Sequence, residues 1–202
     1  MLLSRMMRVP LPKLIAENSG LRFLSRFLIL FVFFYYVNIA AIAITSEGGL
    51  YWQFADKYLD YISFWRYSLL KFSSIIANLV GFDTQMVGPY KLKLAGETHM
   101  VSMVYSCIGY GVTSVWLAFT LAMEFGWKKK LFWLVIGSCG LFILNCFRIV
   151  AILLAHDRLG ENALFDHHTL FNIVAYGFVF LLMYLIIQAN EKTNKNKTVD
   201  SV

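Results

Sequence analysis

The hydrophobic positions of the chain gather into long, nearly uninterrupted runs separated by short polar segments. Four runs come close to or exceed the roughly 20 apolar residues that a helix needs to cross a bilayer, and they cover 27–44, 107–125, 131–154 and 170–188. This pattern predicts an all-α integral membrane protein with four transmembrane helices. A cleaved secretory signal peptide ending near Ala43 is the competing interpretation of the first run. The length of that run and the three later runs favour an uncleaved anchor.

A fifth apolar segment, 61–80, differs because Arg66 and Lys71 lie in its middle. A charge at the centre of a membrane span costs roughly 2.5–3.5 kcal/mol on insertion scales. The polar residues of the segment recur near helical spacing, with Lys71 close to the same face, and they are Ser63, Arg66, Ser74 and Asn78. We therefore expect an amphipathic helix on the outer face of the membrane, with its aromatic side toward the hydrocarbon.

The pattern of polar and apolar residues changes after Gly81. Polar and apolar residues alternate with period two over 90–94 and 98–105, on either side of a turn that contains Gly96. This pattern predicts a short β-hairpin before Cys107. An open sheet edge has unpaired backbone groups, so the hairpin is expected outside the hydrocarbon.

Composition agrees with a membrane protein, since 59% of residues are hydrophobic and 15% are charged. The net charge of +6 comes from basic residues that flank the apolar runs, a placement that sets membrane orientation and does not suggest nucleic acid binding. With Lys128–Lys130 on the cytoplasmic side, both basic ends also fall inside, which requires an even number of crossings. Four crossings satisfy this parity and leave 61–80 on the outer surface, although five crossings with one violated charge rule stay open.

These boundaries predict one membrane-embedded domain at 23–189. A basic cytoplasmic lead at 1–22 precedes it, and a disordered cytoplasmic tail at 190–202 follows it.

Three polar groups on different predicted helices fall at one depth. Cys107 lies 20 residues before Trp127, Arg148 lies 18 residues after Lys130, and the pair His167 and His168 precedes the last span. At a rise of about 1.5 Å per residue, each group lies roughly 27–30 Å from the inner boundary. A thiol, a guanidinium and an imidazole are therefore expected in one outer layer.

These groups suit thiol chemistry. An imidazole can take the proton of Cys107, and the guanidinium of Arg148 can stabilise a thiolate or an oxyanion. Taken singly, each has a structural interpretation: a small buried thiol, an arginine reaching the headgroups, and histidines at a helix start. Cys139 and Cys146 are expected to be structural.

The residues around these groups resemble the exosortase/archaeosortase family. The matching features are Cys107-x-Gly109, the Asn145-x-x-Arg148 context, and a histidine shortly before Phe171. The resemblance covers roughly 101–185, and Ile108 departs from the serine that usually follows the cysteine. It implies a cysteine peptidase or transpeptidase of the compact bacterial type, with Cys107, Arg148 and either His168 or His167 as the catalytic set. Gly109 would let a substrate backbone approach closely. Asn145 would either orient the guanidinium or touch the substrate, or it would make an interhelical hydrogen bond within the bundle. No metal or cofactor is implied.

The resemblance also implies partners and a location. The substrates would be exported proteins that end in a short recognition motif, a transmembrane helix and a basic tail. The enzyme would cut them through a Cys107 thioester on the outer, periplasmic face of the cytoplasmic (inner) membrane.

Two other functions stay open. A membrane metalloprotease or other metal site would draw its ligands from the histidines, one acidic residue and, as a further option, the thiol: His156, His167, His168, Asp157 and Cys107. The chain has no His-Glu-x-x-His motif, and His156 and Asp157 are expected in a loop. A non-enzymatic partner in surface polysaccharide or protein export would need none of these side chains for chemistry.

Overall fold

The computed structural model describes residues 18–46, 50–159 and 167–199, and it describes side chains within 18–46, 50–154 and 172–188. The helices and strands follow in the order α3 (Ser19–Thr45), α4 (Gln53–Leu59), α5 (Tyr61–Leu79), β1 (Thr84–Met86), β2 (Lys91–Leu94), β3 (Met100–Ser102), η1 (Tyr105–Ile108), α6 (Tyr110–Ala122), α7 (Trp127–Leu159) and α8 (His167–Val199). The fold is therefore mostly helical, with one small sheet.

Among the described residues, three segments are long and apolar enough to cross a membrane: Ser19–Thr45, Tyr105–Ala122 and Trp127–Leu154. Asn172–Gln188 is a shorter apolar helix, so a fourth crossing stays a prediction. Large apolar side chains of α3 are exposed, among them Ile29 and Phe33. A surface of this kind suits lipid rather than water, which is compatible with the predicted membrane protein class.

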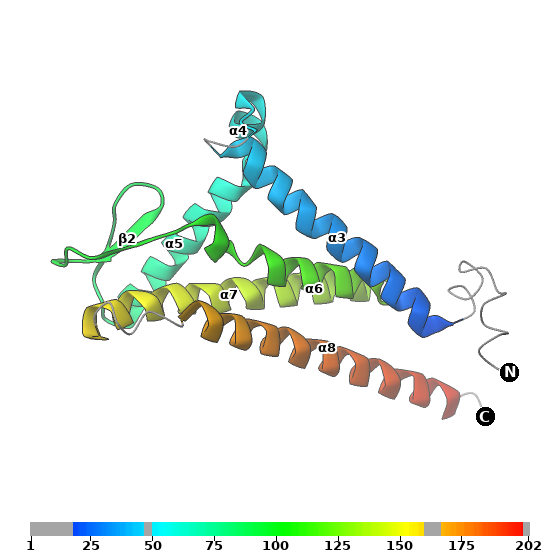
Figure 1. The fold of residues 1–202 in the computed structure, drawn as a ribbon. Coiled ribbons are helices and arrows are strands. Elements are labelled where there is room, and N and C mark those ends of the chain that lie inside the picture. The colour runs from blue at the N-terminus through cyan, green and yellow to red at the C-terminus, as the bar shows by residue number, and fades with distance from the viewer. Residues whose placement is uncertain (1–17, 47–49, 160–166, 200–202) are drawn as a thin grey trace, which may run out of the picture.

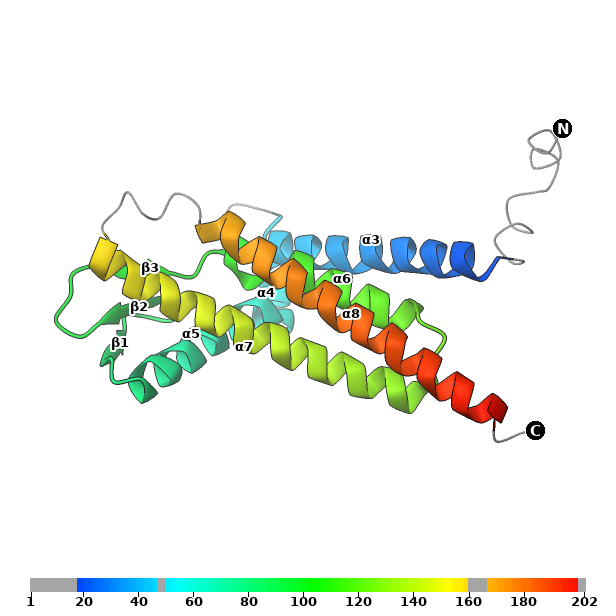
Figure 2. The same cartoon turned by 90° about the horizontal axis from the view of Figure 1, so that it is seen from below.

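The long helices alternate in direction (Figure 1). The start of α3, the end of α8 and the connection between α6 and α7 lie at one end of the molecule, and the sheet lies at the opposite end (Figures 1 and 2). Aromatic rings join α3 to α6, with Phe23 edge-on to Phe119 at 5.8 Å between centroids and Tyr35 beside Tyr110 at 5.6 Å. α6, α7 and α8 pack around a hydrophobic cluster whose fully buried members include Trp116 and Val179.

The sheet has three antiparallel strands rather than the two of the predicted hairpin. β2 pairs with β3, with Leu92 opposite Val101, as the alternating pattern predicted. β1 pairs with the other edge of β2, with Met86 opposite Leu92, and this strand was not predicted. β1 is only three residues long, too short to show a period-two pattern. Leu92 is fully buried and joins the sheet to the core under α5.

The helix over 61–80 exists, but the sheet covers part of its polar face, while Lys71 and Asn78 stay exposed. Arg66 is only 9% exposed. Ser74 and Asn78 make hydrogen bonds to Thr84 of β1, at 2.7 Å and 2.8 Å. The opposite face exposes large apolar residues, and its members include Phe64, Phe72 and Ile75. The sheet therefore takes the place of water on part of the polar side of α5, and the aromatic side is free to face lipid.

α8 continues as a helix to Val199, past residue 190, where the sequence predicted the start of a disordered tail. The stretch 190–199 contains no Pro or Gly and includes helix-favouring Glu and Lys residues. Residues 1–17, most of the predicted lead, lie outside the described residues.

Candidate active site

Cys107 lies in a single 3-10 turn, η1, between the sheet and α6. Its backbone N–H donates to the carbonyl of Val104 at 3.0 Å. The turn ends at Gly109, whose φ of 78° belongs to the left-handed region, and α6 begins at the next residue. Glycine is needed there because a side chain in that region costs roughly 1–2 kcal/mol. At this sharp junction, before α6 begins, the Cys107 side chain is half-buried.

Asn145 of α7 holds this turn from the side. Its amide nitrogen donates to the carbonyls of Cys107 at 3.0 Å and Ile108 at 3.2 Å. The side chain is buried, with 4% exposure. Its carbonyl oxygen has no hydrogen-bond partner among the described residues. Asn145 therefore fixes the backbone that carries the thiol and keeps one acceptor unused.

Arg148 lies one helical turn beyond Asn145, on the same face of α7. Its Nη2 atom donates to the sulfur of Cys107 at 3.9 Å, and the side chain is buried. A guanidinium at this distance can stabilise negative charge that forms beside it during a reaction. The structure therefore brings together four predicted site residues: Cys107, Gly109, Asn145 and Arg148.

The predicted bases, His167 and His168, are the first two residues of α8. Both views place the start of α8 at the same level along the bundle as η1 (Figures 1 and 2). The side chains of both histidines lie outside the described residues, so the choice between them stays open. His156 and Asp157, the ligands considered for a metal site, belong to α7 and not to the expected loop, and their side chains also lie outside the described residues.

The other two cysteines lie away from this arrangement. Cys139 is exposed on α7. Cys146 is buried, and its thiol contacts the carbonyl of Leu69 on α5 at 3.8 Å. Ser73 also donates to the carbonyl of Cys146 at 3.3 Å, so this position belongs to the packing of α5 against α7.

Sequence reasoning missed the role of Arg66. Its guanidinium lies between two tyrosine rings, 3.9 Å from the centroid of Tyr90 and 4.4 Å from that of Tyr105. Nε donates to the carbonyl of Met103 at 3.0 Å, and Nη2 donates to the same oxygen. Arg66 thus ties α5 to the sheet and to the first residue of η1. The helical spacing of polar residues in this segment gave no sign that Arg66 points inward while Lys71 is exposed.

A polar cavity of about 420 Å³ lies on the outer side of Arg66, next to Tyr105 and Tyr90. Asp56 and Asp60 also line it. Asp56 accepts a hydrogen bond from Tyr51 at 2.9 Å, and Asp60 caps α5 by accepting from the N–H of Ser63 at 2.9 Å. Both carboxylates therefore already have structural partners.

Within the described residues, no group of three or more His, Cys, Asp or Glu side chains is placed to hold a metal ion. Comparison with known proteins gives no match for this chain among family models, curated proteins or solved structures.

Proposed function

We propose that the protein is a membrane cysteine peptidase or transpeptidase that cleaves C-terminal sorting signals of exported proteins. The observation that carries this proposal is the contact between Arg148 Nη2 and Cys107 Sγ at 3.9 Å, on a turn that Asn145 holds in place. A buried arginine beside a thiol would be an expensive way to fill space, because the charge has to be desolvated. It is useful where an anion must form, as on a nucleophilic sulfur or a carbonyl oxygen under attack.

The proposed reaction begins when the Cys107 thiol gives its proton to His168 or His167. The thiolate attacks the carbonyl of the scissile peptide bond, a carbon–sulfur bond forms, and Arg148 stabilises the oxyanion. The carbon–nitrogen bond then breaks, and the leaving amine takes the proton from the histidine. Water or an amine next attacks the thioester, its proton passes through the histidine to the sulfur, and the carbon–sulfur bond breaks.

The arrangement of the helices supports a site at a membrane face. Cys107 precedes α6, and Arg148 is 18 residues beyond Lys130, so both lie far from the end of the bundle that carries Lys128–Lys130. The positive-inside rule assigns that lysine end to the cytoplasm. On this basis we place the site at the outer face of the cytoplasmic membrane, with α3, α6, α7 and α8 as four crossings.

The test uses cells that produce the protein at its normal level. Cys107→Ala and Arg148→Gln should both lead to accumulation of exported proteins that keep their C-terminal transmembrane segment, measured by quantitative mass spectrometry of C-terminal peptides. Cys139→Ser is the matched control and should behave as the wild type, because Cys139 is exposed away from the site. A Cys107→Ala protein that folds and leaves every precursor processed would favour the non-enzymatic role in export instead.

A further inference from the structure

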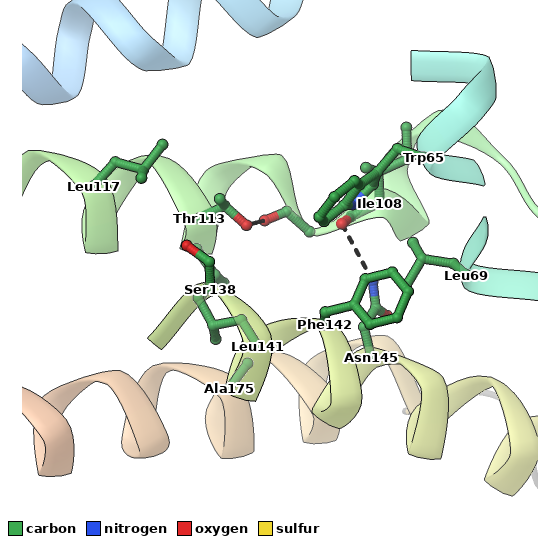
Figure 3. Close-up of a pocket in the computed structure, with 12 residues that line it drawn as sticks. Trp65, Leu69, Ile108, Thr113, Leu117, Ser138, Leu141, Phe142, Asn145 and Ala175 are labelled. Atoms are coloured by element: carbon green, nitrogen blue, oxygen red, sulfur yellow. Dashed lines mark hydrogen bonds between the residues drawn. The ribbon is translucent and has the colours of Figure 1, made fainter. Parts of the chain in front are cut away.

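Two cavities lie close to η1, and they differ in chemistry. The first, of about 120 Å³, lies beside Gly109 between α6 and α7 and is lined mostly by apolar side chains (Figure 3). Neither Cys107 nor Arg148 lines it, and its lining contains no charged side chain. The second is the polar cavity of about 420 Å³ beside Arg66, and its lining contains charges of both signs.

The polar cavity lies where the end of α3, α4 and the start of α5 meet (Figure 1). Thr45, the last residue of α3, and Ser46 belong to its lining. α3 is one of the apolar segments long enough to cross a membrane, so its end marks a boundary of the hydrocarbon. In the membrane orientation proposed above, this boundary is the outer one. The cavity therefore lies at the level of the lipid headgroups of the outer leaflet.

Arg66 supplies a positive charge and one donor group that the fold does not use. The side chain is 9% exposed, and its guanidinium lies between the rings of Tyr90 and Tyr105. Nε and Nη2 both donate to the carbonyl of Met103. Nη1 has no hydrogen-bond partner among the described residues, and it is not sealed from solvent. An anionic oxygen in the cavity can therefore accept a hydrogen bond from Nη1.

Two carboxylates supply the opposite charge. Asp56 accepts from the Tyr51 hydroxyl through Oδ2, and Asp60 accepts from the N–H of Ser63 through Oδ1. Within the described residues, the second oxygen of each carboxylate makes no hydrogen bond, and neither carboxylate forms an ion pair with Arg66. A purely anionic ligand would be repelled by the carboxylates, and a purely cationic one by the guanidinium. The cavity therefore suits a group that carries an anion and an ammonium a short distance apart.

The surroundings of the cavity favour a lipid as the source of this group. Exposed aromatic side chains lie on α4, on the first turn of α5 and next to them, and they are Trp52, Phe54, Tyr58, Tyr61 and Phe64. Tyrosine and tryptophan rings prefer the headgroup level of a bilayer. The cavity volume of about 420 Å³ far exceeds the roughly 30 Å³ that one water molecule takes up in the liquid, so it has room for a headgroup.

We infer that this cavity binds the headgroup of an outer-leaflet phospholipid that contains a phosphate and a primary ammonium, as in phosphatidylethanolamine. The phosphate accepts from Nη1 of Arg66, and the ammonium donates to Asp56 or Asp60. Phosphatidylglycerol lacks the ammonium, and phosphatidylcholine has a quaternary ammonium without an N–H group. The site depends on the membrane orientation proposed above but not on the peptidase activity, so either can fail without the other.

Native mass spectrometry of the purified full chain tests the site directly. The protein in detergent is titrated with phosphatidylethanolamine, phosphatidylcholine and phosphatidylglycerol, all with the same dioleoyl chains. We expect phosphatidylethanolamine to bind about 10-fold more tightly than the other two, because only its headgroup can make charge-assisted hydrogen bonds with both the guanidinium and a carboxylate. Either of the other lipids binding as tightly as phosphatidylethanolamine, or no lipid retained, would overturn the inference.

One double variant tests the carboxylates. Asp56→Asn combined with Asp60→Asn removes both negative charges but keeps acceptors for Tyr51 and Ser63. This protein should bind phosphatidylethanolamine about 10-fold more weakly and phosphatidylglycerol more tightly than the wild type. A folding defect would not move two lipids in opposite directions. Asp83→Asn, at an exposed aspartate that does not line the cavity, is the matched control and should keep the wild-type preference. An unchanged preference in the double variant would overturn the inference.

Two soluble competitors test the phosphate and distinguish a lipid from a free small molecule. O-phosphoethanolamine should displace phosphatidylethanolamine only in large excess, because it has no acyl chains to contact the exposed aromatic residues. Ethanolamine at the same concentration should not displace the lipid, because it has no phosphate for Arg66. Displacement by O-phosphoethanolamine at concentrations equal to that of the lipid would identify a soluble ligand and overturn the lipid assignment. Displacement by ethanolamine as effective as that by O-phosphoethanolamine would overturn the role of Arg66.

Discussion

The Nη2 atom of Arg148 lies 3.9 Å from the sulfur of Cys107, although 41 residues separate the two along the chain. α7 supplies the arginine and η1 supplies the cysteine. Asn145, three residues before Arg148, holds the carbonyls of Cys107 and Ile108 and so fixes the distance between the two groups. The predictions below follow from this arrangement and from the contacts that support it.

Removing the charge of Arg148 should slow the reaction of Cys107 with iodoacetamide at neutral pH several-fold, because the thiolate is the reacting species and would lose the cation 3.9 Å from its sulfur. Arg148→Gln tests this. The alkylation rate of Cys107 in Arg148→Lys should lie between those of Arg148→Gln and the wild type, since lysine keeps the charge but not the fork of donors. The measurement is site-resolved alkylation by mass spectrometry. Unchanged alkylation of Cys107 in Arg148→Gln would contradict the role of the guanidinium.

Replacing Asn145 should loosen η1. Asn145→Ala removes the donor to two carbonyls, and buried carbonyls left unpaired cost about 1–3 kcal/mol. Hydrogen exchange at residues 105–110 should therefore speed up, together with a lower midpoint of thermal unfolding in detergent. Asn172→Ala on the exposed surface of α8 is the matched control and should leave both measurements unchanged. Equal protection of 105–110 in both variants would show that the turn does not depend on Asn145.

Arg66→Met should destabilise the protein by about 2–3 kcal/mol. The variant loses the contacts with Tyr90 and Tyr105 and leaves the carbonyl of Met103 without its donor. Lys71→Met on the exposed side of the same helix removes the same charge and should change stability by less than about 0.5 kcal/mol. Thermal unfolding in one detergent compares the two. Similar midpoints would mean that Arg66 does not anchor the sheet to α5.

Gly137→Ala should disrupt the packing of α7 against α6. A Cβ atom at this position would lie 2.0 Å from the ring of Trp116, which is fully buried and has no free space to move into. Overpacking of this kind costs about 1–3 kcal/mol. Gly177→Ala on α8 meets no heavy atom within 4 Å and should be neutral or stabilising by up to about 1 kcal/mol. A Gly137→Ala protein as stable as Gly177→Ala would contradict the observed close contact.

The helices and the common level of Cys107 and Arg148 could be predicted from the sequence, because long apolar runs and the helical rise are nearly independent of tertiary packing. The orientation of Arg66 could not. Periodicity shows which residues share a face of α5, but it does not show whether that face meets water or a sheet. β1 was missed because three residues carry no readable pattern. The cavity beside Gly109 also escaped prediction, since it depends on side chains from four helices.

The most direct test of the central claim, that Cys107 is the nucleophile, is to look for a substrate fragment attached to its sulfur. The wild-type protein is quenched in acid and purified from cells that contain its substrates, and its proteolytic peptides are analysed before and after treatment with neutral hydroxylamine. We expect an acyl adduct on the peptide that contains Cys107, lost with hydroxylamine and absent from Cys107→Ser. An adduct on Cys139 or Cys146 alone, or no adduct where unprocessed precursor is present, would contradict the account.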